Sequence, residues 1–218
     1  MKQVGGLKIT ILTDRDSWMN RYDRELEERL SRDGHEVLVI QNRDDLQDGD
    51  IAFFLSCFEI VGRKYLARNR HNIVVHASDL PRGKGWSPTT WQILEGKDEI
   101  PLSLFEATEA VDAGSVYMRG VMRLDGCELI DEWQGKLGRK IIDMCCEFVD
   151  QCRHGRLAPV VQSGAETFYP RRKPEDSRLD ANKTIAEQFN LLRVVDNDKY
   201  PAFFEMNGQR YYLRISRS

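Results

Sequence analysis

The 218-residue sequence lacks any apolar run of about 18 residues, the length that marks a membrane-spanning helix. Its first residues, MKQVGGLKITILT, hold one short apolar run among charges and glycines, unlike the longer apolar core of an export signal. These absences predict a soluble, cytoplasmic protein that is neither exported nor in contact with a membrane.

Cysteine is scarce and has no pattern that suggests pairing or metal binding. The five cysteines form an odd set with no CxxC spacing, and no histidine stands near them at metal-ligand intervals. We therefore expect neither a disulfide framework nor a metal site. The cysteines are Cys57, Cys127, Cys145, Cys146 and Cys152.

An excess of positive charge is also missing. The 35 acidic and 32 basic residues are mixed along the chain and give a net charge of -3, without a basic block. This balance predicts no nucleic-acid partner, because such partners are bound through clustered lysine and arginine.

The sequence alternates between short apolar runs rich in β-branched residues and segments whose apolar residues recur at helical spacing. We expect strands at 7–12, 35–40, 50–55, 72–76, 100–106 and 115–121. Helices are expected at 14–33, 60–68, 89–95 and 128–152, with Gly34 as a C-cap. Strand, helix and strand in succession favour an α/β, Rossmann-like domain with a mostly parallel sheet and covering helices.

The last third of the chain differs in composition and predicts further units. A catalytic domain is expected over 1–154 and a polar linker or extended arm over 155–180. A small extension over 181–218 is expected to hold a helix at 181–192 and a β-hairpin, with strands at 202–206 and 209–215. The hairpin turn is the Asn207–Gly208 pair.

The residues best suited to catalysis are His76, at the end of a predicted strand, and Asp112, in an acidic turn. Ligands bind at the carboxyl ends of parallel strands, where a histidine can move a proton or contact an oxyanion. A carboxylate can fix its tautomer. From the residues alone, a structural or solvent-facing role for His76 is the alternative, because most histidines in a protein have such a role.

The stretch VVHASDLPRGKGWSPTTWQILEGKDEIPLSLFEATEAVDAGSVY adds motifs around this pair. It carries His76, Ser78, Leu80 and Pro81, then Gly85 and Pro88, and then Val111, Asp112 and Gly114. This order resembles the core of the N10-formyltetrahydrofolate-dependent formyltransferases, whose members share an N-x-H-x-S-x-L-P motif, a G-x-x-P turn and a V/L-D-x-G turn. The segment 189–215 is similar to the small C-terminal extension of the sugar and tRNA members.

The resemblance implies a fold, a formyl donor and a set of site residues. It implies an α/β formyltransferase domain that uses N10-formyltetrahydrofolate, with His76 as general base or oxyanion contact and Asp112 assisting proton transfer. The positions matching the folate pocket are Phe58, Glu59, Ile60, Val61, Ala107, Thr108 and Glu109, of which Ile60 and Val61 read equally well as core. Ser78, Lys84 and Trp86 are candidates for acceptor binding, with loop anchoring or a solvated charge as the alternatives for Trp86 and Lys84.

One position departs from the family motif. Val74 stands where the family has an asparagine that donates its amide to the formyl oxygen, and a valine has no donor. Asn72 is two residues away along a strand, roughly 6.6 Å, which is too far for the same hydrogen bond. We expect His76 or a backbone N–H to supply the oxyanion contact instead.

The acceptor implied by the resemblance is an amine on a sugar. The segment TFYPRRKPED (167–176) resembles a stretch of the sugar N-formyltransferases, in particular the compact ones associated with pseudaminic-acid-type pathways. A nucleotide-linked amino sugar is therefore the expected substrate. The alternatives are methionyl-tRNA, a carrier-bound aminoacyl group, and a non-catalytic homologue that binds folate or a nucleotide sugar. The C-terminal hairpin is a candidate surface for a homodimer.

Overall fold

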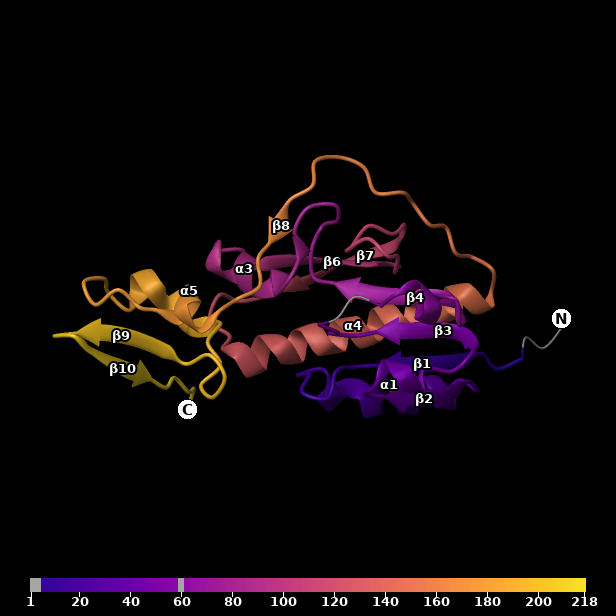
Figure 1. Cartoon of the computed structure of the whole chain (residues 1–218), viewed down its shortest axis with the longest axis horizontal. Helices are drawn as coiled ribbons and strands as arrows, with labels where there is room; N and C mark the ends of the chain where they lie inside the picture. Colours follow the sequence, from indigo (N-terminus) through magenta and orange to yellow (C-terminus); the bar gives the residue numbers. More distant parts are fainter. Residues whose placement is uncertain (1–4, 59–60) are drawn as a thin grey trace.

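The computed structural model describes residues 5–58 and 61–218 and is built around a six-stranded sheet in the order β2-β1-β3-β4-β6-β7 (Figure 1). Four neighbouring strands run parallel and the last two pairings are antiparallel. The strands are β1 (Lys8–Leu12), β2 (Glu36–Ile40), β3 (Gly49–Phe54), β4 (Asn69–His76), β6 (Glu99–Glu106) and β7 (Val116–Arg123). The predicted α/β fold with a mostly parallel sheet is confirmed.

Alternation along the strands gives the sheet two apolar faces. Ile51, Phe53 and Ile73 belong to the large core that includes α1 (Asn20–Arg32) and α4 (Ile130–Arg153). Ala52 and Phe54, one residue out of phase, belong to a smaller cluster on the other face. This period of two is what a strand buried on both sides requires.

The two long helices pack against each other over the large core. Gly138 of α4 faces Tyr22 of α1 so closely that a Cβ there would lie 2.7 Å from the ring. The apolar side chains Trp133, Leu137 and Phe148 of α4 are all buried in this core. Within residues 5–58 and 61–218, no helix has the length and apolar character needed to span a membrane.

The start of α1 differs from the prediction. The helix begins at Asn20 rather than near residue 14, and the residues before it form turns. Ser17 N–H donates to the Asp14 carbonyl (2.9 Å), and the Ser17 hydroxyl accepts from Met19 N–H (3.2 Å). Short polar side chains that form hydrogen bonds with the nearby backbone favour turns over helix. The spacing of apolar residues, on which the prediction rested, does not reveal these hydrogen bonds.

The prediction of a helix at 181–192 is mostly wrong for the same reason. Residues 186–188 form a 3-10 turn, and α5 covers Phe189–Arg193 alone. Before it, the Asp180 carboxylate accepts from Asn182 N–H, and the Glu187 carboxylate accepts from Thr184 N–H. These side-chain contacts satisfy the backbone locally and replace helical hydrogen bonds.

The predicted hairpin is confirmed as β9 (Ala202–Met206) and β10 (Gln209–Leu213), which lie at the opposite end of the molecule from the N-terminus (Figure 1). Asn207 and Gly208 have positive φ angles of 51° and 76°, as the favoured two-residue hairpin turn demands. Leu179, Leu192 and Val195 pack with Ala202 into a separate small cluster.

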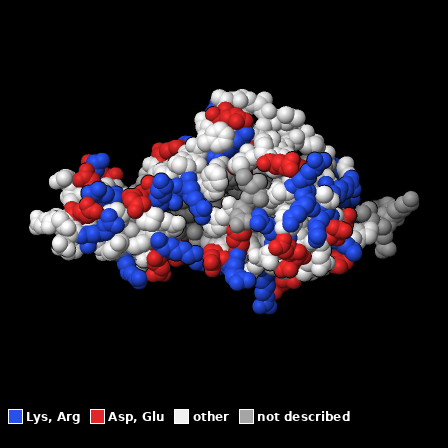
Figure 2. All heavy atoms as spheres, viewed as in Figure 1, with Lys and Arg blue, Asp and Glu red and all other residues white. Residues whose placement is uncertain are grey.

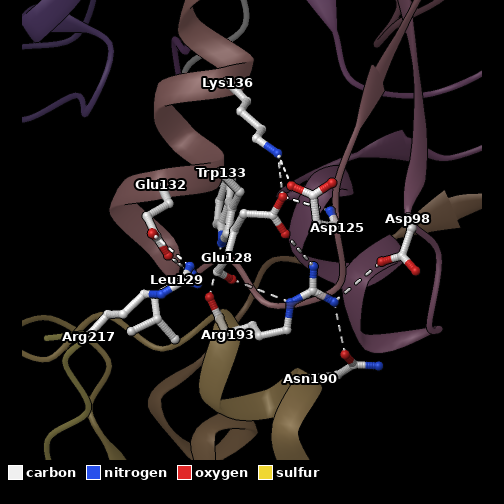
Figure 3. A network of polar contacts seen from close by, with 10 residues as sticks. All are labelled: Asp98, Asp125, Glu128, Leu129, Glu132, Trp133, Lys136, Asn190, Arg193 and Arg217. Atoms are coloured by element: carbon white, nitrogen blue, oxygen red, sulfur yellow. Dashed lines mark hydrogen bonds and ion pairs between the residues drawn. The ribbon is translucent and has the colours of Figure 1, made fainter.

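A buried arginine joins this C-terminal part to the start of α4 and the residue Glu128 before it (Figure 3). Arg193, 1% exposed, lies 3.3 Å from the Glu128 carboxylate and donates to the Asn190 side chain (3.0 Å), and its carbonyl accepts from Trp133 Nε1 (3.0 Å). Lys136 also pairs with Glu128. Burial opposes ionisation of Glu128, but hydrogen bonds from Lys136 and from Asp125 N–H outweigh it and lower the pKa to about 2.

Residues 155–180 leave the end of α4, bridge to the edge strand β7 where Val160 pairs with Val116, and continue as an extended arm (Figure 1). The arm holds the two-residue strand β8 (Phe168–Tyr169), which pairs in parallel with β5 (Lys84–Gly85). It thereby contacts the loop between β4 and α3 (Pro88–Leu94). The division of the chain into a catalytic domain, an arm and an extension stays a prediction.

Candidate active site

A pocket of about 170 Å³ opens at the carboxyl ends of β3 and β4. It is slightly larger than an engineered cavity of about 150 Å³ that takes up benzene, so it has room for a flat ring. Mostly apolar walls with a few polar groups are typical of small-molecule sites. The lining residues are Phe54, Ser56, Cys57, Phe58, Val61, Val74, Val75, His76, Gly85, Trp86, Phe105, Ala107, Thr108, Ala110, Val111 and Asp112.

His76 and Asp112 meet at the wall of this pocket. His76 is the last residue of β4, and its Nε2 lies 3.8 Å from Asp112 Oδ2 and 2.8 Å from the Gly83 carbonyl. A carbonyl only accepts, so this contact assigns a proton to Nε2. A neutral His76 then keeps Nδ1 unprotonated and able to accept a proton. The two residues predicted from the motif are brought together, each with a side chain about one-tenth exposed (10% and 14%).

The Asp112 turn is held by the loop before α3 and by close backbone approach. Asp112 has a φ of 48°, and its carboxylate accepts from Gly85 N–H at 2.9 Å. A Cβ on Gly114 would lie 1.6 Å from the Glu106 carbonyl, so only glycine lets the chain pass there. The V-D-x-G motif thus has a steric basis in its glycine.

The glycine-rich loop after His76 is fixed by the arm. Lys84 N–H donates to the Thr167 carbonyl (2.9 Å) and Trp86 N–H donates to the Tyr169 carbonyl (3.1 Å). Gly85 has a φ of 98°, and a Cβ there would meet the Tyr169 carbonyl at 2.4 Å. Backbone therefore lies directly against backbone at the point where the loop borders the pocket.

Val74 lines the pocket two residues before His76 and offers no hydrogen-bond donor from its side chain. It is paired across the sheet with Phe54 and Phe105, and it packs against a cluster that includes Leu80. Asn72 is buried elsewhere, where its amide donates to the carbonyls of Leu66 and Asn69. It is not among the residues that line the pocket.

Of the residues predicted to bind the folate, the structure places Phe58, Val61, Ala107 and Thr108 in the pocket lining. Glu109 is exposed and is not part of that lining. Glu59 and Ile60 lie outside the described residues.

The residues predicted for the acceptor fall into two groups. Trp86 lines the pocket and is 37% exposed, so it is available to a ligand. Lys84 is 3% exposed and its ammonium lies 2.5 Å from the Glu166 carboxylate, while Ser78 is 2% exposed. Neither Lys84 nor Ser78 lines the pocket, and Lys84 holds the arm against the loop instead.

Several lining residues had no sequence signal. Cys57 immediately precedes Phe58, yet a lone cysteine indicates nothing by itself. Burial, and then the nearby carboxylates of Asp14 and Asp23, raise the pKa of the Cys57 thiol well above its ordinary range. Cys57 is therefore a neutral thiol in the wall and not a nucleophile. The arm residues Gln162 and Thr167, which touch the Asp112 turn and the loop after His76, lie 50 and 84 residues from their partners in the sequence and also had no sequence signal.

Comparison of the structure with solved proteins defines the class of fold. A sugar N-formyltransferase from Shewanella sp. matches with a TM-score of 0.71 at 12% identity, over 97% of this chain and 98% of that one. HypX from Aquifex aeolicus, solved in complex with tetrahydrofolic acid, matches with a TM-score of 0.76 at 17% identity, over 94% of this chain and 37% of that one. The chain has the α/β formyltransferase fold.

Sequence comparison supports the same relationship. No family model matches the chain. A methionyl-tRNA formyltransferase from Lactococcus lactis subsp. cremoris is 26% identical over 178 residues, which are 79% of this chain and 54% of the relative, so the chain spans about half of that protein's length. By sequence and by fold, the chain is a relative of the formyltransferases.

Proposed function

We propose that the chain transfers a formyl group from N10-formyltetrahydrofolate to the amine of an amino sugar, most favourably a nucleotide-linked one. The observation that carries the proposal is the contact of His76 with Asp112 at the wall of a pocket that has room for a flat ring. The tetrahydrofolic acid complex of a protein with this fold supports a folate as the donor.

The arrangement supports a simple course of transfer. The acceptor amine attacks the formyl carbon, and a new C–N bond forms as the carbonyl electrons move onto the oxygen. His76 accepts the proton released by the amine and returns one to N10 when the old C–N bond breaks, with Asp112 stabilising the charged imidazole. Val74 offers no contact to the oxyanion, so the protonated His76 or a backbone N–H must supply it.

A sugar acceptor is supported by the surface of the protein, on which charges of both signs are mixed. Lys and Arg are interspersed with Asp and Glu over the face seen in Figure 2, whereas binding of a tRNA relies on grouped positive charge. Methionyl-tRNA remains the second candidate, because the relative found by sequence acts on it by name.

The test is an acceptor screen with purified protein and N10-formyltetrahydrofolate. Nucleotide-linked amino sugars, free amino sugars and methionyl-tRNA are supplied separately, and tetrahydrofolate release and the formylated product are both measured. We expect turnover with an amino sugar that His76→Ala and Asp112→Ala reduce at least 100-fold. His154→Ala, at the exposed C-terminal end of α4, is the matched control.

Two results would contradict the proposal. Turnover with methionyl-tRNA and with no amino sugar would show that methionyl-tRNA, the second candidate, is the substrate. Folate binding measurable by calorimetry without turnover of any acceptor would indicate a non-catalytic homologue, which the loss of the donor at position 74 favours.

A further inference from the structure

The arm contacts Asp112 directly and His76 through Gly83, at two places five residues apart in the sequence. Gln162 reaches the turn that carries Asp112, and Thr167 reaches the loop that faces His76. Neither residue lines the pocket. Their effect on the reaction must therefore pass through the geometry of His76 and Asp112.

Gln162 spans the Asp112 turn with a single amide group. Its Nε2 donates to the Asp112 carbonyl at 2.9 Å and to the Gly114 carbonyl at 2.8 Å. Two carbonyl acceptors fix the orientation of the amide, because an oxygen in the same place would face both of them. The two hydrogen bonds join the residues on either side of Ala113 and hold the turn closed.

Asp112 needs such support because its backbone is strained. A φ of 48° is in the left-handed region, which disfavours residues with a side chain. The conformation persists where the surroundings impose it. Gln162 supplies that restraint from the carbonyl side, and Gly85 N–H holds the carboxylate from the other side.

Thr167 performs the corresponding task for His76. Its hydroxyl accepts from Gly83 N–H at 2.8 Å, and the Gly83 carbonyl in turn contacts His76 Nε2 at 2.8 Å. The Lys84–Glu166 ion pair and the β5–β8 pairing fix the same stretch of the arm. The arm thus fixes the position of the Gly83 carbonyl, the hydrogen-bond acceptor that assigns the His76 tautomer.

We propose that the arm is a built part of the active site, in which Gln162 is the positioning residue for Asp112 and Thr167 the positioning residue for His76. This inference rests on the proposed function for its kinetic consequence. Its structural consequence, an ordered turn at 111–114 that depends on Gln162, is independent of which acceptor the protein uses.

The kinetic test is a double-mutant cycle on the acceptor found in the screen. Gln162→Met removes both donors at similar size, and we expect kcat to fall roughly 10- to 100-fold, as small displacements of catalytic groups do. The KM for the acceptor should change less than about threefold. In an Asp112→Asn background the same change should cost less than about twofold, because the residue that it positions has already been disabled. Gln151→Met, on the exposed side of α4, is the matched control.

Thr167 is tested by a conservative pair. Thr167→Val removes the hydroxyl at constant shape and should lower kcat roughly tenfold, whereas Thr167→Ser keeps the hydroxyl and should restore most of the rate. A loss that is the same in both variants would show that the methyl group and packing matter, and it would overturn the role assigned to the hydroxyl.

The second measurement is hydrogen exchange of the amides at 111–114, which needs no substrate. Faster exchange in Gln162→Met than in the wild type, with unchanged exchange in β1 and β3, is the expected result. Equal fold losses of kcat in both backgrounds, a kcat within twofold of wild type, or unchanged exchange would each refute the inference. If the wild type transfers formyl to no acceptor, the proposed function fails, and the exchange data still decide whether Gln162 orders the turn.

Discussion

The substitution Val74→Asn tests whether the site simply lacks a donor to the oxyanion or holds the oxyanion through another group. Val74 lines the pocket two residues before His76 on the same face of β4, so an amide placed there would reach the space where the formyl oxygen is expected. One well-placed donor is worth about 10²- to 10³-fold in rate. We expect the substitution to raise the single-turnover rate of formyl transfer at least tenfold.

The same substitution should lower stability by a modest amount. The side chain at 74 packs beside Phe54 and Phe105, and an amide without a partner among them costs about 1–3 kcal/mol. Because Val74 is only half-buried, we expect about 1 kcal/mol, which corresponds to a fall in Tm of about 2–4 °C for a chain of this size. Differential scanning fluorimetry measures this shift beside the kinetics.

Val74→Leu is the control, since leucine has the shape of asparagine and no donor. A rate that rises in the asparagine variant and not in the leucine variant assigns the gain to the amide. A fall in rate for the asparagine variant with Tm near that of wild type would refute the reasoning. It would mean that the oxyanion is held by another group, which the amide displaces.

Two further predictions concern the buried carboxylate of Glu128 and the glycine at position 114. The pKa of Glu128 is lowered from 4.5 to about 2, so its stabilisation is complete at neutral pH and is lost as pH falls from about 4.5 toward 2. Between pH 7 and pH 3 the free energy of unfolding in urea should therefore drop by about 2 kcal/mol more in wild type than in Glu128→Gln, and an equal drop would contradict the pairing. Gly114→Ala should displace the Asp112 turn, lowering kcat more than tenfold and stability by roughly 2 kcal/mol or more, because its Cβ would overlap the Glu106 carbonyl. Gly5→Ala, with open space around it, should change neither quantity.

The sequence predicted the sheet well because its strands are short, apolar and separated by helical periodicity. The His76–Asp112 pair was found through the motifs around it, and the structure gives those motifs physical reasons. Gly85 and Gly114 stand where backbone passes backbone too closely for a Cβ. The carboxyl-end position of His76 follows from β4 running parallel to β1 and β3.

What escaped prediction was set by contacts between distant segments. Lys84 is indistinguishable from a solvated loop cation until Glu166 is placed beside it, 82 residues later. The strands β5 and β8 have two residues each, which is too short for any alternation to be seen. Gln162 stands in a polar segment without periodicity, so neither its donors nor their two acceptors could be inferred.

The separation of 84 residues between Gly83 and Thr167 has a consequence for synthesis of the protein on the ribosome. At about 5–20 residues per second, roughly 4–17 s pass between translation of the loop after His76 and translation of the segment that braces it. During that interval β1, β3 and β4 can already pair, while the reaction centre still lacks its brace. A nascent chain can therefore pair these strands before the segment that holds the loop after His76 has been translated.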